Sequence, residues 1–212
     1  MAVTTWDNLR IACLQKMFSL DDATLVRSST TTPYINMMPA AANEAMLILA
    51  TVGRQFQKCF SLEQGKVEPT ETFGCWSAYD LKGLIDDFYT LNEIFRGSDG
   101  SYEKFKNFRL EGERYLLLPA EADGVFRIWY EAYPMKITAE TSGDTVIDLH
   151  PEAALMVPLY MAGQLYKDDD LNIAQTYMNE WAVWLEGVKE SAKRAKGLNK
   201  TNGGWTSTTG WT

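Results

Sequence analysis

The last part of the chain carries a long, regular stripe of apolar residues, and this stripe limits the folds open to the sequence. The apolar residues recur there at alternating spacings of three and four, which is the period of one face of an α-helix. Acidic residues precede the stripe and basic residues gather at its end, as the helix dipole favours. We predict a helix over 169–196 that packs along its length on other helices. The stripe comprises Leu171, Ala174, Met178, Trp181, Leu185, Val188, Ala192 and Ala195.

Three other segments carry helical signals and supply the packing partners. Apolar residues from Trp6 to Met17 have helical spacing, with Thr4 or Thr5 as the N-cap. Pro39 and Gly53 bound a run of helix formers that is apolar almost all round and is expected to be buried. A proline also opens the third segment. The predicted helices are 5–18, 39–52 and 151–166, and the Ser- and Thr-rich stretch 19–38 is predicted to be an irregular connection.

The region 54–134 has a different pattern and is predicted to be β structure. Aromatic and β-branched residues come there in short blocks separated by Gly, Pro, Asp and Asn. The strongest segment is Val125–Ala132, in which Phe126, Ile128, Tyr130 and Ala132 share one face. Turns are predicted at 110–112 and 122–124, so that the last three strands form a meander, and a short helical turn is predicted within 80–87. Weaker strand candidates are 55–62, 88–95, 102–108 and 114–118.

Together these segments predict an α+β fold. Two N-terminal and two C-terminal helices form a bundle, and a central antiparallel β-sheet or sandwich is inserted between them. We predict one domain over 1–196 and a flexible C-terminal extension over 197–212.

Charge and cysteine content narrow the class of protein. The chain has 212 residues and a formal net charge of −8, which argues against binding of nucleic acid through its phosphates. Cys13, Cys59 and Cys75 form no CxxC pair, so neither a disulfide framework nor a zinc site is suggested. The most apolar stretch, 45–50, is far shorter than the roughly 20 residues that span a bilayer. We expect a cytosolic protein that does not bind a membrane.

Catalytic residues are scarce in the sequence. His150 is the one histidine, so a hydrolytic site built on Cys75 would need it as the base. The simpler interpretation places His150 at a helix start and Cys75 in a loop. Asp86 with Asp87, and Asp168–Asp170, lack the spacing of a calcium loop and are interpreted as solvated helix starts. We predict no enzyme activity, no metal and no cofactor.

The C-terminal segment has the composition of a binding tail. It carries no charge after Lys200 and contains two tryptophans six residues apart, and an uncharged aromatic segment of this kind can add to a partner as an extended strand. The residues predicted to make this contact are Gly203, Gly204, Trp205, Thr206, Thr208, Gly210, Trp211 and Thr212.

The order of parts and three motifs resemble one family of virion proteins. The motifs are Tyr130 to Thr138 (YEAYPMKIT), Asp148 to Glu152 (DLHPE) and Pro158 to Asp170 (PLYMAGQLYKDDD), continued by Ala174, Tyr177 and Trp181. They are similar to the head-to-tail adaptor, or connector, family of tailed bacteriophages, in which a strand ends in a Tyr-x-x-x-Pro-like corner and the following helix closes in a Tyr-x-Asp-Asp-like turn. Tail tube proteins of short-tailed phages resemble the same pattern.

The resemblance implies a structural protein of the virion neck, made in the host cytoplasm. It implies a ring of about a dozen copies that docks under the portal protein, continues the DNA channel without sequence-specific binding, and offers a platform to the next neck or tail protein. The C-terminal segment would contact the portal. Helix packing or ring contacts would involve Trp181, Trp184, Leu185 and Val188. The alternatives are another neck or tail tube subunit of similar fold and a small hydrolase.

Overall fold

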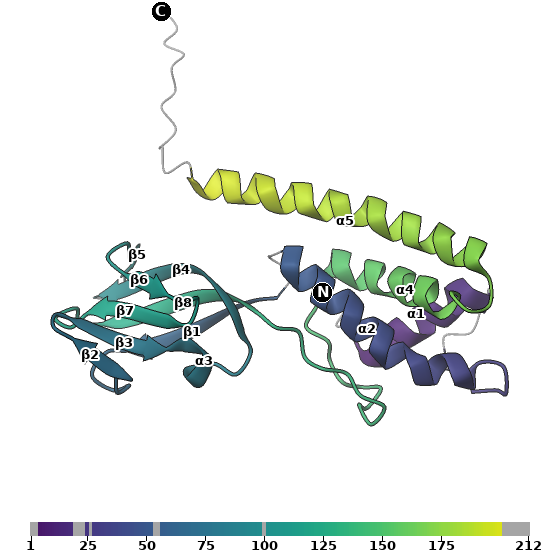
Figure 1. The fold of residues 1–212 in the computed structure, drawn as a ribbon, viewed down its shortest axis with the longest axis horizontal. Coiled ribbons are helices and arrows are strands. Elements are labelled where there is room, and N and C mark those ends of the chain that lie inside the picture. The colour runs from purple at the N-terminus through teal and green to yellow at the C-terminus, as the bar shows by residue number, and fades with distance from the viewer. Residues whose placement is uncertain (1–3, 19–23, 26, 53–55, 99–100, 201–212) are drawn as a thin grey trace, which may run out of the picture.

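The structure, a computed structural model, describes residues 4–18, 24–25, 27–52, 56–98 and 101–200. Within these residues it is an α+β protein, as predicted. Figure 1 shows the long helices on one side and the strands, with a short helix beside them, on the other. Most buried apolar residues of both parts belong to one continuous cluster.

The helical part is built around α4 (Pro151–Leu165), which packs against the three other long helices. These are α1 (Trp6–Phe18), α2 (Thr32–Val52) and α5 (Leu171–Lys200). Ten of the fifteen residues of α4 are buried, because neighbours cover it on several sides. The predicted packing of the C-terminal helices on the N-terminal ones is confirmed.

The helix starts follow the capping chemistry of the sequence, with one correction. Thr5 caps α1 by accepting a hydrogen bond from the Asn8 amide at 3.3 Å, as predicted. The prediction that 19–38 is irregular and that a helix starts at Pro39 is wrong, because α2 already starts at Thr32. Ser28 and Thr31 exchange side-chain-to-amide hydrogen bonds of 2.9 and 3.1 Å that set up this start. Pro33 therefore occupies the first turn, where a missing N–H costs little, and Pro39 lies inside the helix.

The final helix begins at the acidic run. The Asp170 carboxylate accepts hydrogen bonds from the amides of Asn172 and Ile173, at 2.9 and 3.1 Å. This is N-capping by a carboxylate, which also suits the helix dipole. The helix extends to Lys200, four residues beyond the predicted end.

The strands form two antiparallel four-stranded sheets. The first has the order β1 (Gln57–Glu63), β8 (Val125–Ala132), β4 (Phe88–Ser98), β5 (Ser101–Lys104). The second has the order β2 (Glu71–Phe73), β3 (Trp76–Asp80), β7 (Tyr115–Pro119), β6 (Arg109–Glu111). The short helix α3 (Leu81–Leu84) follows β3, within the predicted range.

The predicted inner face of β8 is confirmed. Phe126, Ile128 and Ala132 have no exposed surface and Tyr130 is 5% exposed, whereas Arg127 and Trp129 on the opposite face are exposed. Alternation along a strand places every second side chain on the same face, and for this reason the inner face could be predicted from the sequence.

The predicted meander of the last three strands is wrong. β7 pairs with β3 and β6 in the second sheet, whereas β5 and β8 both pair with β4 in the first. The turn near 110–112 joins β6 to β7 instead, and Gly112 and Glu113 have φ angles of 59° and 54°. Leu110 itself lies in β6. β2, β3 and β6 were not predicted, because runs of three to five residues show too little alternation to detect.

The helix α2 is long and apolar. Among the described residues, α2 is the one helix whose length and composition would allow it to cross a bilayer. Eight of its residues are buried within the structure, as in the core helix of a folded domain.

Candidate functional site

The two residues of the hydrolase alternative lie in different parts of the molecule. Cys75 lies in the turn between β2 and β3, and His150 occupies the N-cap position of α4 without a capping side-chain hydrogen bond. Figure 1 shows these two elements in the sheet part and the helical part. The structure therefore does not bring together the nucleophile and base that the alternative requires.

The acidic pairs are used in local contacts. The prediction that Asp87 is a helix start is wrong, because Asp87 follows α3. Its carboxylate binds the Lys58 ammonium at 2.6 Å and the Tyr130 hydroxyl at 2.9 Å. Asp169 accepts a hydrogen bond from Tyr34, and Asp170 caps α5. Within the described ranges no group of three His, Cys, Asp or Glu side chains is placed to hold a metal ion.

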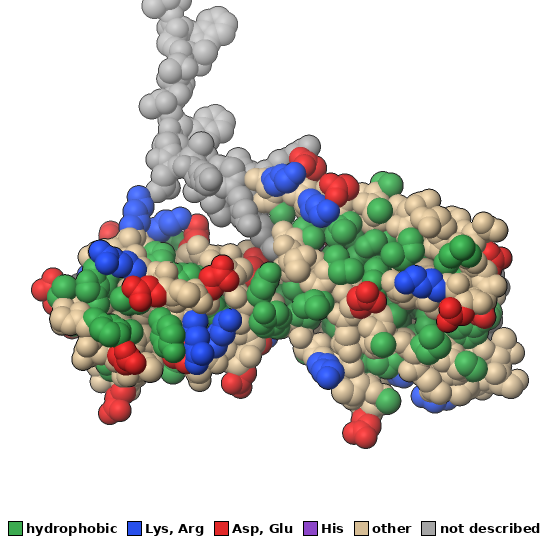
Figure 2. All heavy atoms as spheres, viewed as in Figure 1, with side chains coloured by type: hydrophobic (Ala, Val, Ile, Leu, Met, Phe, Trp, Pro, Cys, Tyr) green, Lys and Arg blue, Asp and Glu red, His purple; other side chains and the backbone are tan. Residues whose placement is uncertain are grey.

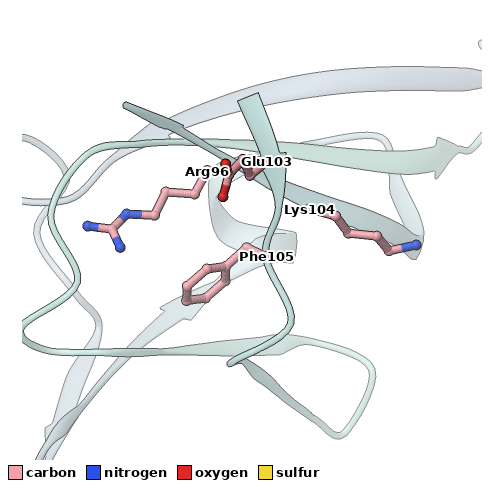
Figure 3. A pocket seen from close by; sticks show the side chains of 4 residues that line it. All are labelled: Arg96, Glu103, Lys104 and Phe105. Atoms are coloured by element: carbon pink, nitrogen blue, oxygen red, sulfur yellow. The ribbon is translucent and has the colours of Figure 1, made fainter. Parts of the chain in front are cut away.

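A hollow of about 250 Å³ at the β4–β5 edge is lined by Arg96, Glu103, Lys104 and Phe105. Figure 3 shows the Arg96 and Lys104 side chains pointing in opposite directions. Arg96 donates to the Asp123 carbonyl at 2.7 Å, and Lys104 donates to Glu93 at 2.7 Å. Because both cations serve the protein itself, the hollow does not have the convergent polar groups of a ligand site.

The four residues predicted on the last helix divide into two groups. Trp181 is 4% exposed and packs against Tyr160 with ring centroids 5.0 Å apart. Val188 is 5% exposed, and Leu185 is partly buried against the same core. These three side chains serve packing within the subunit. Trp184 is the exception, because it is 44% exposed on the outer side of α5.

Trp184 belongs to a row of residues that faces away from the core. We call this row the α5 stripe, and its members recur at spacings of three, four and seven: Ile173, Glu180, Trp184, Gly187 and Ser191, all exposed. Only Glu180 among them is charged. A Cβ atom at Gly187 would meet nothing within 4 Å, so packing within the subunit does not require the glycine. The stripe thus combines the exposed Trp184 with a glycine, one turn further along, whose backbone no described side chain covers.

A second exposed row runs along α2. Met37, Ala40, Glu44, Leu47 and Thr51 are exposed at spacings of three, four, three and four, and we call them the α2 stripe. Met37 and Leu47 are 49% and 48% exposed. Glu44 is the one charged residue in all of α2. Alternating spacings of three and four are the pattern by which one helix packs along another.

The two stripes lie on different helices. α4 packs against both α2 and α5, and Figure 1 shows it between them. In Figure 2, hydrophobic side chains gather on the visible face of the helical part. A subunit with two different rows of exposed, nearly uncharged residues can bind copies of itself head to tail, one row against the other.

Sequence reasoning missed the α2 stripe. The helix was expected to be buried all round because its residues are apolar almost throughout, and one face is in fact exposed. The signal that could have located it is Glu44. A single charged residue in an otherwise uncharged helix marks the face that is turned away from the core. The predicted portal-contacting residues Gly203–Thr212 lie outside the described residues.

Comparison with known proteins does not assign a family, since no family model matches the chain and a search of curated proteins finds no match.

Proposed function

We propose that the chain is the subunit of a homo-oligomeric ring, acting as a head-to-tail adaptor between the portal and the tail of a tailed phage. The observation that carries the ring is the presence of two exposed, nearly uncharged helical stripes, on α2 and α5, in one subunit. Rows that combine large exposed apolar side chains with a single charge are more typical of interaction surfaces than of solvated helix faces.

The geometry of the stripes favours a ring over a dimer. A two-fold dimer uses the same patch on both subunits, whereas the α2 and α5 stripes are different surfaces on different helices. Pairing of α2 in one copy with α5 in the next leaves one stripe free at each end of the pair. Further copies add until the ring closes.

The charge of the subunit suits a conduit for DNA. The net charge of −8 repels a phosphate backbone, so DNA would pass without being held by counterion release. Two lysines of α5 are neutralised locally, since Lys189 and Lys193 pair with Glu186 and Glu190 at 2.6 and 2.8 Å. The resemblance to the adaptor family supplies the remaining part of the proposal, namely docking on the portal protein and on the next neck or tail protein.

Single charged substitutions test the ring. Leu47→Glu in the α2 stripe and Trp184→Glu in the α5 stripe are expected to give monomers, whereas the unchanged protein forms rings that are measured by light scattering and electron microscopy. Leu155→Glu is the matched control, because Leu155 is 64% exposed on α4 and belongs to neither stripe. Rings that survive both stripe variants, or that Leu155→Glu also abolishes, would refute this interface.

Position in the particle separates the adaptor from a tail tube or another neck subunit. Lysine cross-linking of native particles should join Lys196 or Lys200, at the end of α5, to the portal protein and should also join copies of this chain. Links to distal tail proteins alone would assign the chain to the tube. Absence of the chain from particles would reject every virion assignment and leave the hydrolase alternative, for which the structure offers no assembled site.

A further inference from the structure

The β1 strand is the longest regular edge in the two sheets. Each of the four edge strands pairs with a single neighbour among the described strands, and β5, β2 and β6 have only three or four residues. β1 has seven residues and pairs with β8 without a bulge, from Gln57 opposite Glu131 to Glu63 opposite Val125. Proteins usually shorten, bulge or cover such edges, because an open edge is a template for another strand.

The open backbone groups of β1 can be assigned. The Phe56 carbonyl accepts from the Ala132 amide at 2.8 Å, so the even-numbered residues of β1 direct their hydrogen bonds toward β8. The amides and carbonyls of Gln57, Cys59 and Ser61 therefore point toward the open edge. The charges beside this edge are already paired, Lys58 with Asp87 and Glu63 with Lys66, at 2.6 and 2.9 Å. An uncharged strand suits this edge better than a charged one.

The outer face of the sheet beside β1 has room for large side chains. Cys59 and Ser61 are small and exposed, and across the strand they lie opposite Trp129 and Arg127. Trp129 is 40% exposed, and the Arg127 guanidinium lies 4.8 Å from the ring centre of Tyr102. A strand added to β1 would place its alternate side chains over the two small residues, against Trp129 and Arg127.

The end of the chain has the matching composition. Residues 205–212 read Trp-Thr-Ser-Thr-Thr-Gly-Trp-Thr, with no charge and high β propensity. The spacing of six places Trp205 and Trp211 on the same face of an extended strand, together with Ser207 and Thr209.

The position of α5 indicates which copy receives this strand. Figure 1 shows the end of α5 on the β5 side of the first sheet, with β1 on the far side. Five Cα-to-Cα steps separate Lys200 from Trp205, and they span at most about 18 Å when extended. A strand added outside β1 lies four interstrand steps from β5, about 19 Å in total, before the distance from α5 to the sheet is added. The β1 edge of another copy is therefore the better acceptor.

We propose that Trp205–Thr212 of one copy adds as a strand to the open β1 edge of a second copy, with both tryptophans on the outer face beside Trp129. This assigns to the ring itself a segment that the family resemblance assigns to the portal. It rests on the proposed function only in requiring a second copy.

Disulfide trapping between two full-length chains tests the assignment. Both chains carry Cys75→Ser, since Cys75 is exposed and Cys13 is buried. The isotope-labelled acceptor keeps Cys59, and the unlabelled donor carries Cys59→Ser with Ser207→Cys. Oxidation is expected to join donor to acceptor, because Ser207 shares the tryptophan face. A donor with Thr208→Cys on the opposite face is the matched control and is expected to give little product.

An acceptor variant separates strand addition from chance contact. Ser61→Pro removes an amide that points to the open edge, which an edge strand tolerates, and it should abolish the disulfide. Ser61→Ala keeps the amide and should retain it, and thermal unfolding of both variants checks that the fold is intact. Equal trapping of Thr208→Cys, or trapping that survives Ser61→Pro, would overturn the inference.

Two further results distinguish this inference from the ring interface. A single chain carrying both Cys59 and Ser207→Cys should form its disulfide between chains, and an intrachain disulfide would overturn the assignment to a second copy. In a Leu47→Glu background the helical interface is lost, and the interchain disulfide should persist. Loss of the disulfide there together with the ring would show that the strand contact does not form independently, which would also contradict the inference.

Discussion

The Asn43 side chain binds both backbone groups of Ile137. Its amide nitrogen donates to the Ile137 carbonyl at 2.7 Å, and its oxygen accepts from the Ile137 amide at 2.8 Å. This pair fixes the long connection 133–150 to α2 on one side. On the other side, the Ile147 amide donates to the Thr4 carbonyl at 2.9 Å. Two anchored isoleucines, both nearly fully buried, thus hold an irregular segment that joins the sheets to the helical part.

Asn43→Ala should destabilise the protein by about 1–3 kcal/mol, because it removes two hydrogen bonds and leaves the Ile137 groups without their partner. The free energy of unfolding in urea measures the effect. Asn179→Ala is the control, because Asn179 is exposed on α5 and accepts a hydrogen bond from Gln175 one turn away on the same helix. Equal losses in the two variants would show that the Asn43 pair is not what holds the connection.

Trp181→Ala should reduce stability and Trp184→Ala should reduce self-association, although both residues lie on α5. Trp181→Ala is expected to lose about 3–5 kcal/mol of stability, because its buried ring packs on Tyr160. Trp184→Ala is expected to change stability by under about 1 kcal/mol and to weaken self-association. Unfolding curves and sedimentation measure the two quantities. A stable Trp181→Ala protein, or unchanged association in Trp184→Ala, would contradict this division.

The sequence was most informative where a pattern repeats over several turns or along a whole strand. The stripe from Leu171 to Ala195 predicted α5, and the alternation in 125–132 predicted the inner face of β8. In both, the apolar residues recur with the period of the element, so local sequence is enough to detect it. Local sequence does not identify which strands pair with each other in the same way. β7 pairs with β3 across an intervening 34 residues of chain that includes β4 and β5, and local residue order does not specify such a partner.

The candidate site was less predictable than the fold. Trp181 and Trp184 are both aromatic residues of one helix, and only their angular position relative to α4 decides that one is core and the other is exposed. The α2 stripe was hidden because Met37 and Leu47 look like core residues in the sequence. Similarly, Pro39 has the sequence signal of a helix start, but the hydrogen bonds between Ser28 and Thr31 start the helix earlier.

Alkaline pH should destabilise the protein partly through Tyr160. Burial, followed by a hydrogen bond to Glu44, raises the pKa of Tyr160 from 10.0 to about 12. The unfolded chain therefore releases this proton at lower pH than the folded protein does. The contribution to stability is fully present below pH 10 and is lost as the pH rises toward 12.

Tyr160→Phe removes that titration, so its unfolding free energy should fall less steeply than that of the unchanged protein between pH 10 and pH 12. Urea unfolding at several pH values measures the two slopes, and the difference at pH 8 gives the pH-independent cost of losing the hydroxyl. Parallel slopes in the two proteins would show that Tyr160 is not a source of the alkaline sensitivity.

Two helical glycines should respond oppositely to alanine. A Cβ at Gly163 of α4 would lie 2.8 Å from the Met178 sulfur, so Gly163→Ala should destabilise the subunit by crowding α5. At Gly187 the same atom meets nothing, and Gly187→Ala should stabilise α5 by about 0.5–1 kcal/mol. If a neighbouring copy approaches the α5 stripe closely at Gly187, the same substitution should weaken ring assembly. A Gly187→Ala protein that is more stable and assembles as well as the unchanged protein would remove Gly187 from the proposed interface, while a protein that is more stable and assembles poorly would place the contact beside Trp184.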